Sequence, residues 1–150
     1  MKYEKTQYGW IGIILLLMII VSMNIAYVKQ LGTHPIPKVP FLIMTGIFFV
    51  ILGLFYKLTI IVADRTIKIV YGIGIIRKVI SPDRILSTQV KKLPWYYGSG
   101  IRITPHGWLY SISGFKVVQI EFETKGIDKA ILIGTSEPEE LKRIIDNNFS

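Results

Sequence analysis

The chain has 150 residues, of which 51% are hydrophobic, and its 18 Lys and Arg residues outnumber its 10 Asp and Glu residues to give a net charge of +8. Cysteine is absent, which excludes a disulfide scaffold, a thiolate metal site and a cysteine nucleophile. The charges are spread unevenly, because only Lys29 and Lys38 are charged between Gly9 and Tyr56. This distribution excludes a single water-soluble globule and a disordered chain.

Two uncharged runs near the N-terminus have the length of membrane spans. The first, Gly9 to Val28, has 20 residues, and as a helix it would cross the roughly 30 Å hydrocarbon core of a bilayer. The second, 39–56, has 18 residues, and the ten residues between the runs have the Gly and Pro content of a turn. The sequence therefore predicts transmembrane helices at about 9–28 and 39–56, joined as an antiparallel hairpin.

A cleavable signal peptide is the alternative interpretation of the first run, because Lys2 and Lys5 precede it. The run is longer than the roughly 7–15 apolar residues of a signal peptide, and a second span follows it. Neither span contains Asp, Glu, Lys, Arg or His, which argues against a proton relay or an ion path. We therefore expect the hairpin to be an anchor.

Small residues fall at matching depths of the two spans if both helices are straight. Gly12 lies near the depth of Gly53, and Ser22 lies near the depth of Gly46. Such pairs would allow the helices to approach closely. Glycine is also common in spans that do not use it for packing, so both interpretations stay open.

Basic residues near the ends of the spans predict the orientation of the hairpin. The segment after the second span is rich in them, and two more precede the first span, against Lys29 and Lys38 in the loop between the spans. The basic residues after the second span are Lys57, Arg65, Lys68, Arg77 and Lys78. We therefore expect a multi-pass protein of the cell membrane with both termini in the cytoplasm.

After Tyr56 the apolar runs give way to short segments with the alternating pattern of β-strands. Asp64 and Arg65 mark a tight hairpin turn between the first two segments. The expected strands are 58–63, 66–71, 75–80, 85–92, 110–113, 117–124 and 129–133. The sequence therefore predicts about seven antiparallel strands.

The end of the chain has a helical period. Ser136 and Glu139 have the spacing of a capping box, and Pro138 lies where the first turn of a helix tolerates proline. Apolar residues then recur at helical spacing, at Leu141, Ile144, Ile145 and Phe149. We expect a transmembrane hairpin in residues 1–57 and, in residues 58–150, an all-β barrel or bent sandwich closed by one C-terminal helix.

The second half of the chain resembles a known family. The resemblance covers roughly residues 57–149 and is carried by its aromatic and glycine residues. These are the strings Trp95-Tyr96-Tyr97-Gly98-Ser99-Gly100-Ile101-Arg102, Gly107-Trp108-Leu109-Tyr110, Ser113-Gly114, Ile133-Gly134-Thr135 and Glu137-Pro138-Glu139. This pattern is similar to that of membrane-anchored bacterial pleckstrin-homology-like (PH-like) proteins. The resemblance implies a seven-stranded barrel with a terminal helix, and a binding or assembly role.

The residues that support catalysis are scarce. The sequence has two histidines, of which His34 lies in the loop between the spans and His106 in a predicted turn. Gly72 and Gly74 lack the third glycine of a dinucleotide-binding loop, and we find no phosphate-binding loop, zinc-protease motif or nucleophile elbow. We therefore expect a protein that is not an enzyme, with no catalytic residues, no metal and no cofactor.

Aromatic and basic residues are the candidates for binding. The candidate contacts with a partner or the membrane are Trp95, Tyr96, Tyr97, Trp108 and Tyr110, which alternatively pack over the core. The candidate contacts with anionic lipid are Arg65, Arg77, Lys78, Lys91 and Lys92, whose charge alternatively serves topology alone. The positive charge is too scattered to indicate nucleic-acid binding.

We expect a non-enzymatic module that docks a protein partner, or a second copy of itself, at the cytoplasmic face of the membrane. One alternative is a sensor of anionic lipid head groups. Another is an accessory subunit of a larger membrane transporter or envelope enzyme.

Overall fold

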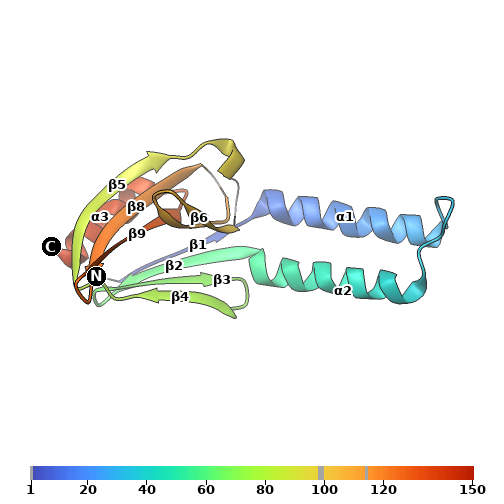
Figure 1. Ribbon diagram of the computed structural model, residues 1–150, viewed down its shortest axis with the longest axis horizontal. Coiled ribbons are helices and arrows are strands. Elements are labelled where there is room, and N and C mark those ends of the chain that lie inside the picture. The colour runs from blue at the N-terminus through green and yellow to red at the C-terminus, as the bar shows by residue number, and fades with distance from the viewer. Residues whose placement is uncertain (1, 98–99, 114) are drawn as a thin grey trace.

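Two long apolar helices extend from one end of a β-domain. A computed structural model describes residues 2–97, 100–113 and 115–150. Helix α1 (Trp10–Val28) and helix α2 (Lys38–Phe55) lie antiparallel (Figure 1). Each helix is long and apolar enough to cross a membrane, and only 6% of each apolar window is buried within the protein. The two predicted spans are therefore confirmed as helices, with boundaries that shift by one residue.

An aromatic contact joins the two helices near their connecting loop. The rings of Tyr27 and Phe41 stack with their centroids 4.0 Å apart, near the loop that joins the helices. A Cβ atom added to Gly12, Gly46 or Gly53 would meet nothing within 4 Å. Of the two interpretations left open for these glycines, the structure favours the one in which they do not serve packing between the helices.

The first sheet has four antiparallel strands in the order β1-β2-β3-β4. Its strands are β1 (Tyr3–Tyr8), β2 (Lys57–Ala63), β3 (Thr66–Tyr71) and β4 (Ile76–Ile80). The predicted hairpin of β2 and β3 is confirmed, and its turn residues Asp64 and Arg65 both adopt positive φ. The sequence analysis assigned no element to residues 3–8, which here form the edge strand beside β2.

The second sheet has five strands in the order β5-β8-β9-β7-β6. Its strands are β5 (Arg84–Lys92), β6 (Gly100–Thr104), β7 (Gly107–Ser111), β8 (Lys116–Thr124) and β9 (Ile127–Gly134). Strand β7 lies parallel to β9, so the expectation of purely antiparallel pairing was wrong. The parallel pair arises because β7 joins the sheet beyond β9, as part of a hairpin with β6.

The two sheets form a sandwich and not the expected seven-stranded barrel. The described residues contain nine strands in two separate sheets, and no closed barrel is formed. One core runs between the sheets, with Ile60 and Ile69 from the first sheet and Ile120 and Ile133 from the second among its buried members. The two additional strands are β1, whose sequence lacks a clear apolar alternation, and β6, a five-residue strand in which Ile101 and Ile103 alternate with Arg102 and Thr104.

The C-terminal helix α3 (Pro138–Phe149) packs on this core as predicted. Leu141, Ile144, Ile145 and Phe149 are all buried. The expected capping box is not formed, because Glu137 is the N-cap residue and makes no side-chain cap hydrogen bond. The N–H of Ser136 instead donates to Gln7 Oε1 at 3.0 Å, so the start of α3 is held by β1.

Both helices of the hairpin continue directly from neighbouring strands. Strand β1 ends at Tyr8 and α1 begins at Trp10, while α2 ends at Phe55 and β2 begins at Lys57. The β1–β2 ladder extends to the pair of Tyr8 and Lys57, which are adjacent to the helices. The β-domain is therefore held to the helices by two short connections, which leave it little freedom to swing.

Candidate functional site

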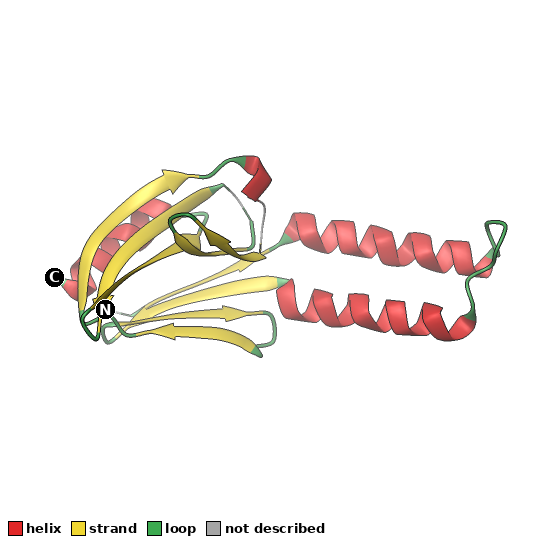
Figure 2. Cartoon of the chain, viewed as in Figure 1, coloured by secondary structure: helices red, strands yellow, loops and turns green. Residues whose placement is uncertain are grey.

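The end of the β-domain from which the helices leave carries exposed apolar side chains. We call this end the helix-side rim, and it includes the β3–β4 turn (72–75) and the short helix η1 (Trp95–Tyr97) (Figure 2). The N–H of Gly72 donates to the carbonyl of Lys57 at 2.8 Å, which holds the turn beside the end of α2. Ile73 and Ile75 in this turn are 67% and 70% exposed.

The aromatic residues of η1 divide between the surface and the interior. Trp95 and Tyr96 are 78% and 64% exposed. Tyr97, with Leu93, packs instead against a second, small core on the outer face of the second sheet. This small core consists of Leu109, Val117 and Leu132. Helix η1 therefore presents two aromatic rings at the helix-side rim and is itself held in place by a third.

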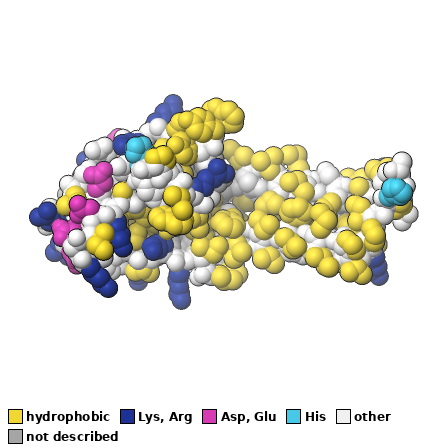
Figure 3. All heavy atoms as spheres, viewed as in Figure 1, with side chains coloured by type: hydrophobic (Ala, Val, Ile, Leu, Met, Phe, Trp, Pro, Cys, Tyr) yellow, Lys and Arg dark blue, Asp and Glu magenta, His cyan; other side chains and the backbone are white. Residues whose placement is uncertain are grey.

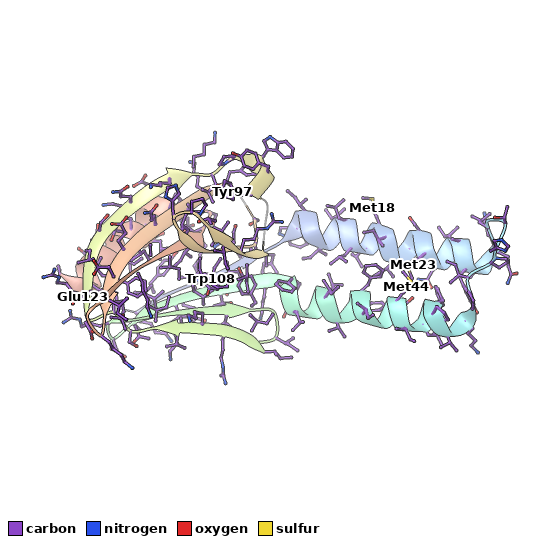
Figure 4. The ribbon with its side chains drawn as sticks, in the orientation of Figure 1. Met18, Met23, Met44, Tyr97, Trp108 and Glu123 are labelled. Carbon is purple, nitrogen blue, oxygen red and sulfur yellow. The ribbon has the colours of Figure 1, made fainter. Side chains whose placement is uncertain are left out.

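Trp108 lies on the opposite side of β6 from Tyr97 (Figure 4). It is paired with Ile103 across the β6–β7 hairpin, and the two side chains are 48% and 73% exposed. Within the described residues, β6 has a hydrogen-bonded neighbour on one side only, so it is an edge of the second sheet. We call Ile103 and Trp108 the edge patch.

Tyr110 does not lie at the surface. Its side chain is 7% exposed and belongs to the main core, and this burial raises the pKa of its hydroxyl. The structure therefore places one of the five aromatic candidates in the interior, where it has no access to a partner. Residues Gly98, Ser99 and Gly114 of the sequence pattern lie outside the described residues.

The basic candidates fall into three places. Arg77 and Lys78 are exposed on β4, directly after the β3–β4 turn at the helix-side rim. Lys91 and Lys92 lie at the end of β5 that leads into η1, opposite Val117 and Lys116 of β8. Arg65 lies in the β2–β3 turn, at the far end of the domain from the helices. Four of the five candidates therefore lie toward the helices, and Arg65 does not.

On one face of the domain, the acidic side chains lie toward the end away from the helices (Figure 3). In Figure 3 the Asp and Glu side chains lie toward that end, whereas Lys and Arg side chains lie both there and near the base of the helices. Glu123, labelled in Figure 4, lies at this far end. Elsewhere on the domain, Lys91 and Lys92 line one hollow together with Glu137, Glu139 and Glu140, so acidic side chains also lie beside two of the basic candidates.

A groove opens where the helices meet the second sheet. Its volume is about 510 Å³, and one wall is formed by Gly9, which precedes α1, and by residues of α1 that include Gly12 and Ile19. Leu52 and Phe55 of α2 form a second wall, and residues 100–102 and 111–112 form the third. Arg102 is the one charged residue among the described residues that line it.

The sequence analysis missed the groove, the β3–β4 turn and Ile103 as surface features. Residues 72–75 alternate Gly and Ile, and this pattern indicates a turn that carries isoleucines. The side chains of a turn extend beyond the end of the sheet, so they are exposed unless another element covers them. The groove had no local signal, since its walls come from parts of the chain that are distant in sequence.

Comparison with protein-family models, with curated proteins and with solved structures finds no match. The evidence for a function therefore comes from the residues of the candidate site themselves.

Proposed function

We propose that this protein is a non-enzymatic, two-span membrane protein whose β-domain is fixed on the membrane surface as a docking platform for a protein partner or a second copy. The observation that carries the proposal is the pair of direct connections from β1 to α1 and from α2 to β2. These connections hold the helix-side rim at the surface of any membrane that the helices cross.

Three properties support insertion of the helices in a membrane. Most of their apolar surface is not covered by other parts of the protein. Ile11 and Val39, for example, are 71% and 66% exposed, and exposure of so much apolar surface to water is unfavourable. Trp10 and Tyr56 lie at the rim ends of the helices, where aromatic rings favour the head-group region. The basic residues beside the rim favour the orientation with both termini in the cytoplasm.

The exposed side chains of the rim fit contact with lipid. Trp95, Tyr96, Ile73 and Ile75 combine apolar area with a position next to the helix ends. We therefore assign Trp95 and Tyr96 to the membrane, and assign the docking role to the edge patch of Ile103 and Trp108. An edge strand with an exposed Ile-Trp pair offers a partner both free backbone groups and apolar surface.

The resemblance to bacterial PH-like proteins remains part of this proposal. The packing of α3 on a β-core supports it, whereas the two separate sheets differ from the barrel that the family implies.

Photo-crosslinking in cells tests the docking role. A benzophenone side chain in place of Trp108 in the full chain is expected to give an adduct with one defined protein, either a second copy or another chain. The adduct should be lost when Ile103→Lys is added. The same probe in place of Trp95 is the matched control and is expected to capture lipid. Absence of any protein adduct from position 108 would contradict the docking role.

A reporter fused after Ser150 tests the orientation. A reporter that is active only in the cytoplasm is expected to be active, and an inactive reporter with normal protein levels would contradict the topology.

Sensing of anionic lipid head groups is the second candidate. The positions of Arg77, Lys78, Lys91 and Lys92 toward the helices favour it, because each basic residue near an anionic surface contributes about 1 kcal/mol. Exchange of these four residues for Gln should then abolish any enrichment of anionic lipid around the protein. Arg65→Gln is the matched control, since it lies at the far end.

A further inference from the structure

The groove between the helices and the second sheet has the dimensions of a site for one lipid chain. It follows α1 from Gly9 to Ile19, which is ten residue steps or about 15 Å of helix. This length equals about half of a 30 Å hydrocarbon core, and thus one leaflet. On α2 the groove involves only Leu52 and Phe55, at the end next to the β-domain. The groove therefore spans the leaflet that adjoins the β-domain.

The chemistry of the groove changes along its length. Toward the middle of α1 its described walls are apolar, with Leu15, Leu16 and Ile19. At the β-domain end, Arg102 contributes a guanidinium, and no carboxylate lies among the described residues that line the groove. Arg102 is exposed and takes part in no ion pair within the described part of the chain. Its charge is therefore available to an anion.

We propose that this groove binds one anionic phospholipid of the adjoining leaflet, with its phosphate on Arg102 and one acyl chain along α1. The inference rests on the proposed crossing of the membrane by α1 and α2. A guanidinium binds phosphate through two parallel hydrogen bonds, and the apolar wall beyond it accepts a hydrocarbon chain. A volume of about 510 Å³ holds the first part of the lipid, and the rest of the chain continues into the bilayer.

Gly12 keeps the groove open. Gly12 lines the groove, and a Cβ atom at this position would meet nothing within 4 Å, so a side chain here can begin in open space. A Gly12→Leu variant is therefore expected to fold normally and to fill the space of the lipid chain.

Native mass spectrometry of the full chain tests the proposal. The protein is incorporated in nanodiscs of equal parts phosphatidylglycerol and phosphatidylcholine and then released into mild detergent. We expect one phosphatidylglycerol to be retained per chain. Arg102→Gln should lower the retained fraction about fivefold, the effect of one basic residue. Gly12→Leu should abolish retention, and Arg84→Gln, which removes an exposed cation at the end of the domain away from the helices, should leave it unchanged.

Three outcomes would overturn the proposal: equal retention of both lipids, retention that survives both Arg102→Gln and Gly12→Leu, or an equal loss in Arg102→Gln and Arg84→Gln. The first two indicate unspecific lipid, and the third indicates surface charge without a site. Extraction of the wild-type chain from membranes by alkaline carbonate would instead contradict the proposed function, because an integral protein resists it.

Discussion

The backbone N–H of Gly9 donates a hydrogen bond of 3.0 Å to the carbonyl oxygen of Tyr56. Gly9 precedes α1 and Tyr56 follows α2, so this bond continues the β1–β2 ladder to the point where both segments become helical. A side chain at Gly9 would be crowded, because its Cβ atom would lie 2.9 Å from Cγ1 of Ile112. The two connections are thus tied to each other and packed against the second sheet.

Substitution of Gly72 should weaken this junction. Gly72 has a φ of +53°, and a Cβ atom there would overlap the carbonyl oxygens of Gly53 and Leu54 in α2. Gly72→Ala combines backbone strain with a clash and should destabilise the β-domain by about 2–4 kcal/mol. Thermal unfolding of the full chain in detergent, followed by circular dichroism, measures the effect.

Gly126→Ala is the matched control for that substitution. Gly126 has a φ of +74°, but an added Cβ atom would meet nothing within 4 Å. Gly126→Ala should therefore lower the stability only by the backbone strain of the left-handed conformation, about 1–2 kcal/mol. Equal destabilisation by the two variants would show that the contact with α2 is unimportant.

A second prediction concerns the hydrogen bond between the two sheets. The Tyr71 hydroxyl donates to the carbonyl of Ser111 at 3.2 Å, and burial raises the pKa of this hydroxyl, which keeps it a donor at neutral pH. Tyr71→Phe leaves the ring contact with Phe55 but removes the bond, and should cost about 1–2 kcal/mol of stability. Tyr110→Phe should cost less, because the Tyr110 hydroxyl makes no hydrogen bond within the described residues. The prediction fails if the two variants unfold at the same temperature.

The ion pair between Lys5 and Glu137 should make stability depend on pH. The Lys5 ammonium donates a 2.6 Å hydrogen bond to Glu137 Oε1 and holds the pKa of this carboxyl below its ordinary value of 4.5. A lowered folded-state pKa stabilises the fold above the unfolded-state pKa, and the contribution is lost as the pH falls through the folded-state pKa. Glu137→Gln should therefore lower the unfolding temperature at pH 7, and the difference from wild type should disappear in acid.

Glu139→Gln is the control for the ion pair, since it removes a charge from the same helical turn that forms no ion pair among the described residues. It should change the unfolding temperature less at pH 7. A Glu137→Gln effect of equal size at pH 7 and at pH 3 would contradict the assignment to the ionised carboxylate.

Tryptophan fluorescence should separate the rim from the edge patch. Variants that retain only Trp95 or only Trp108, with the other tryptophans changed to Phe, are placed in liposomes that contain lipid with a spin label near the head group. We expect strong quenching of Trp95, which is 78% exposed at the rim, and little quenching of Trp108 on the β6–β7 hairpin. Equal quenching would place both residues at the same depth and would remove the distinction between them.

Local patterns were sufficient to predict much of this fold. The two apolar helices, the β2–β3 hairpin with its turn at Asp64 and Arg65, and the apolar face of α3 were all predicted correctly. Each depends on residues that are close in sequence and on one strong physical preference. For the helices this is uniform apolarity, and for the turn it is a spacing that leaves two residues between strands.

The missed elements depend on partners that are distant in sequence. Strand β1 turns Tyr3, Lys5 and Gln7 to one face, and two of these are polar, so apolar alternation could not reveal it. Gln7 is 6% exposed, because its amide donates to the carbonyl of Gly134 and accepts from Ser136. The same long-range contact replaces the predicted capping box. Within the candidate site, the sequence identified Trp95 and Trp108 as possible contact residues. It could not show that Trp95 lies at the helix-side rim and Trp108 in the edge patch, because these positions depend on the folded chain.

The paired ladder of β1 and β2 gives the molecule a mechanical property. The hydrogen-bonded strands β1 and β2 continue into α1 and α2 without a flexible linker. The helix pair and the first sheet are therefore expected to move together as one rigid unit. If α1 and α2 cross a membrane as proposed, a change in the thickness of the bilayer would tilt them. The far end of the domain, with the turn at Asp64 and Arg65, would then move through the same angle as the helices, so bilayer thickness would determine where the edge patch points.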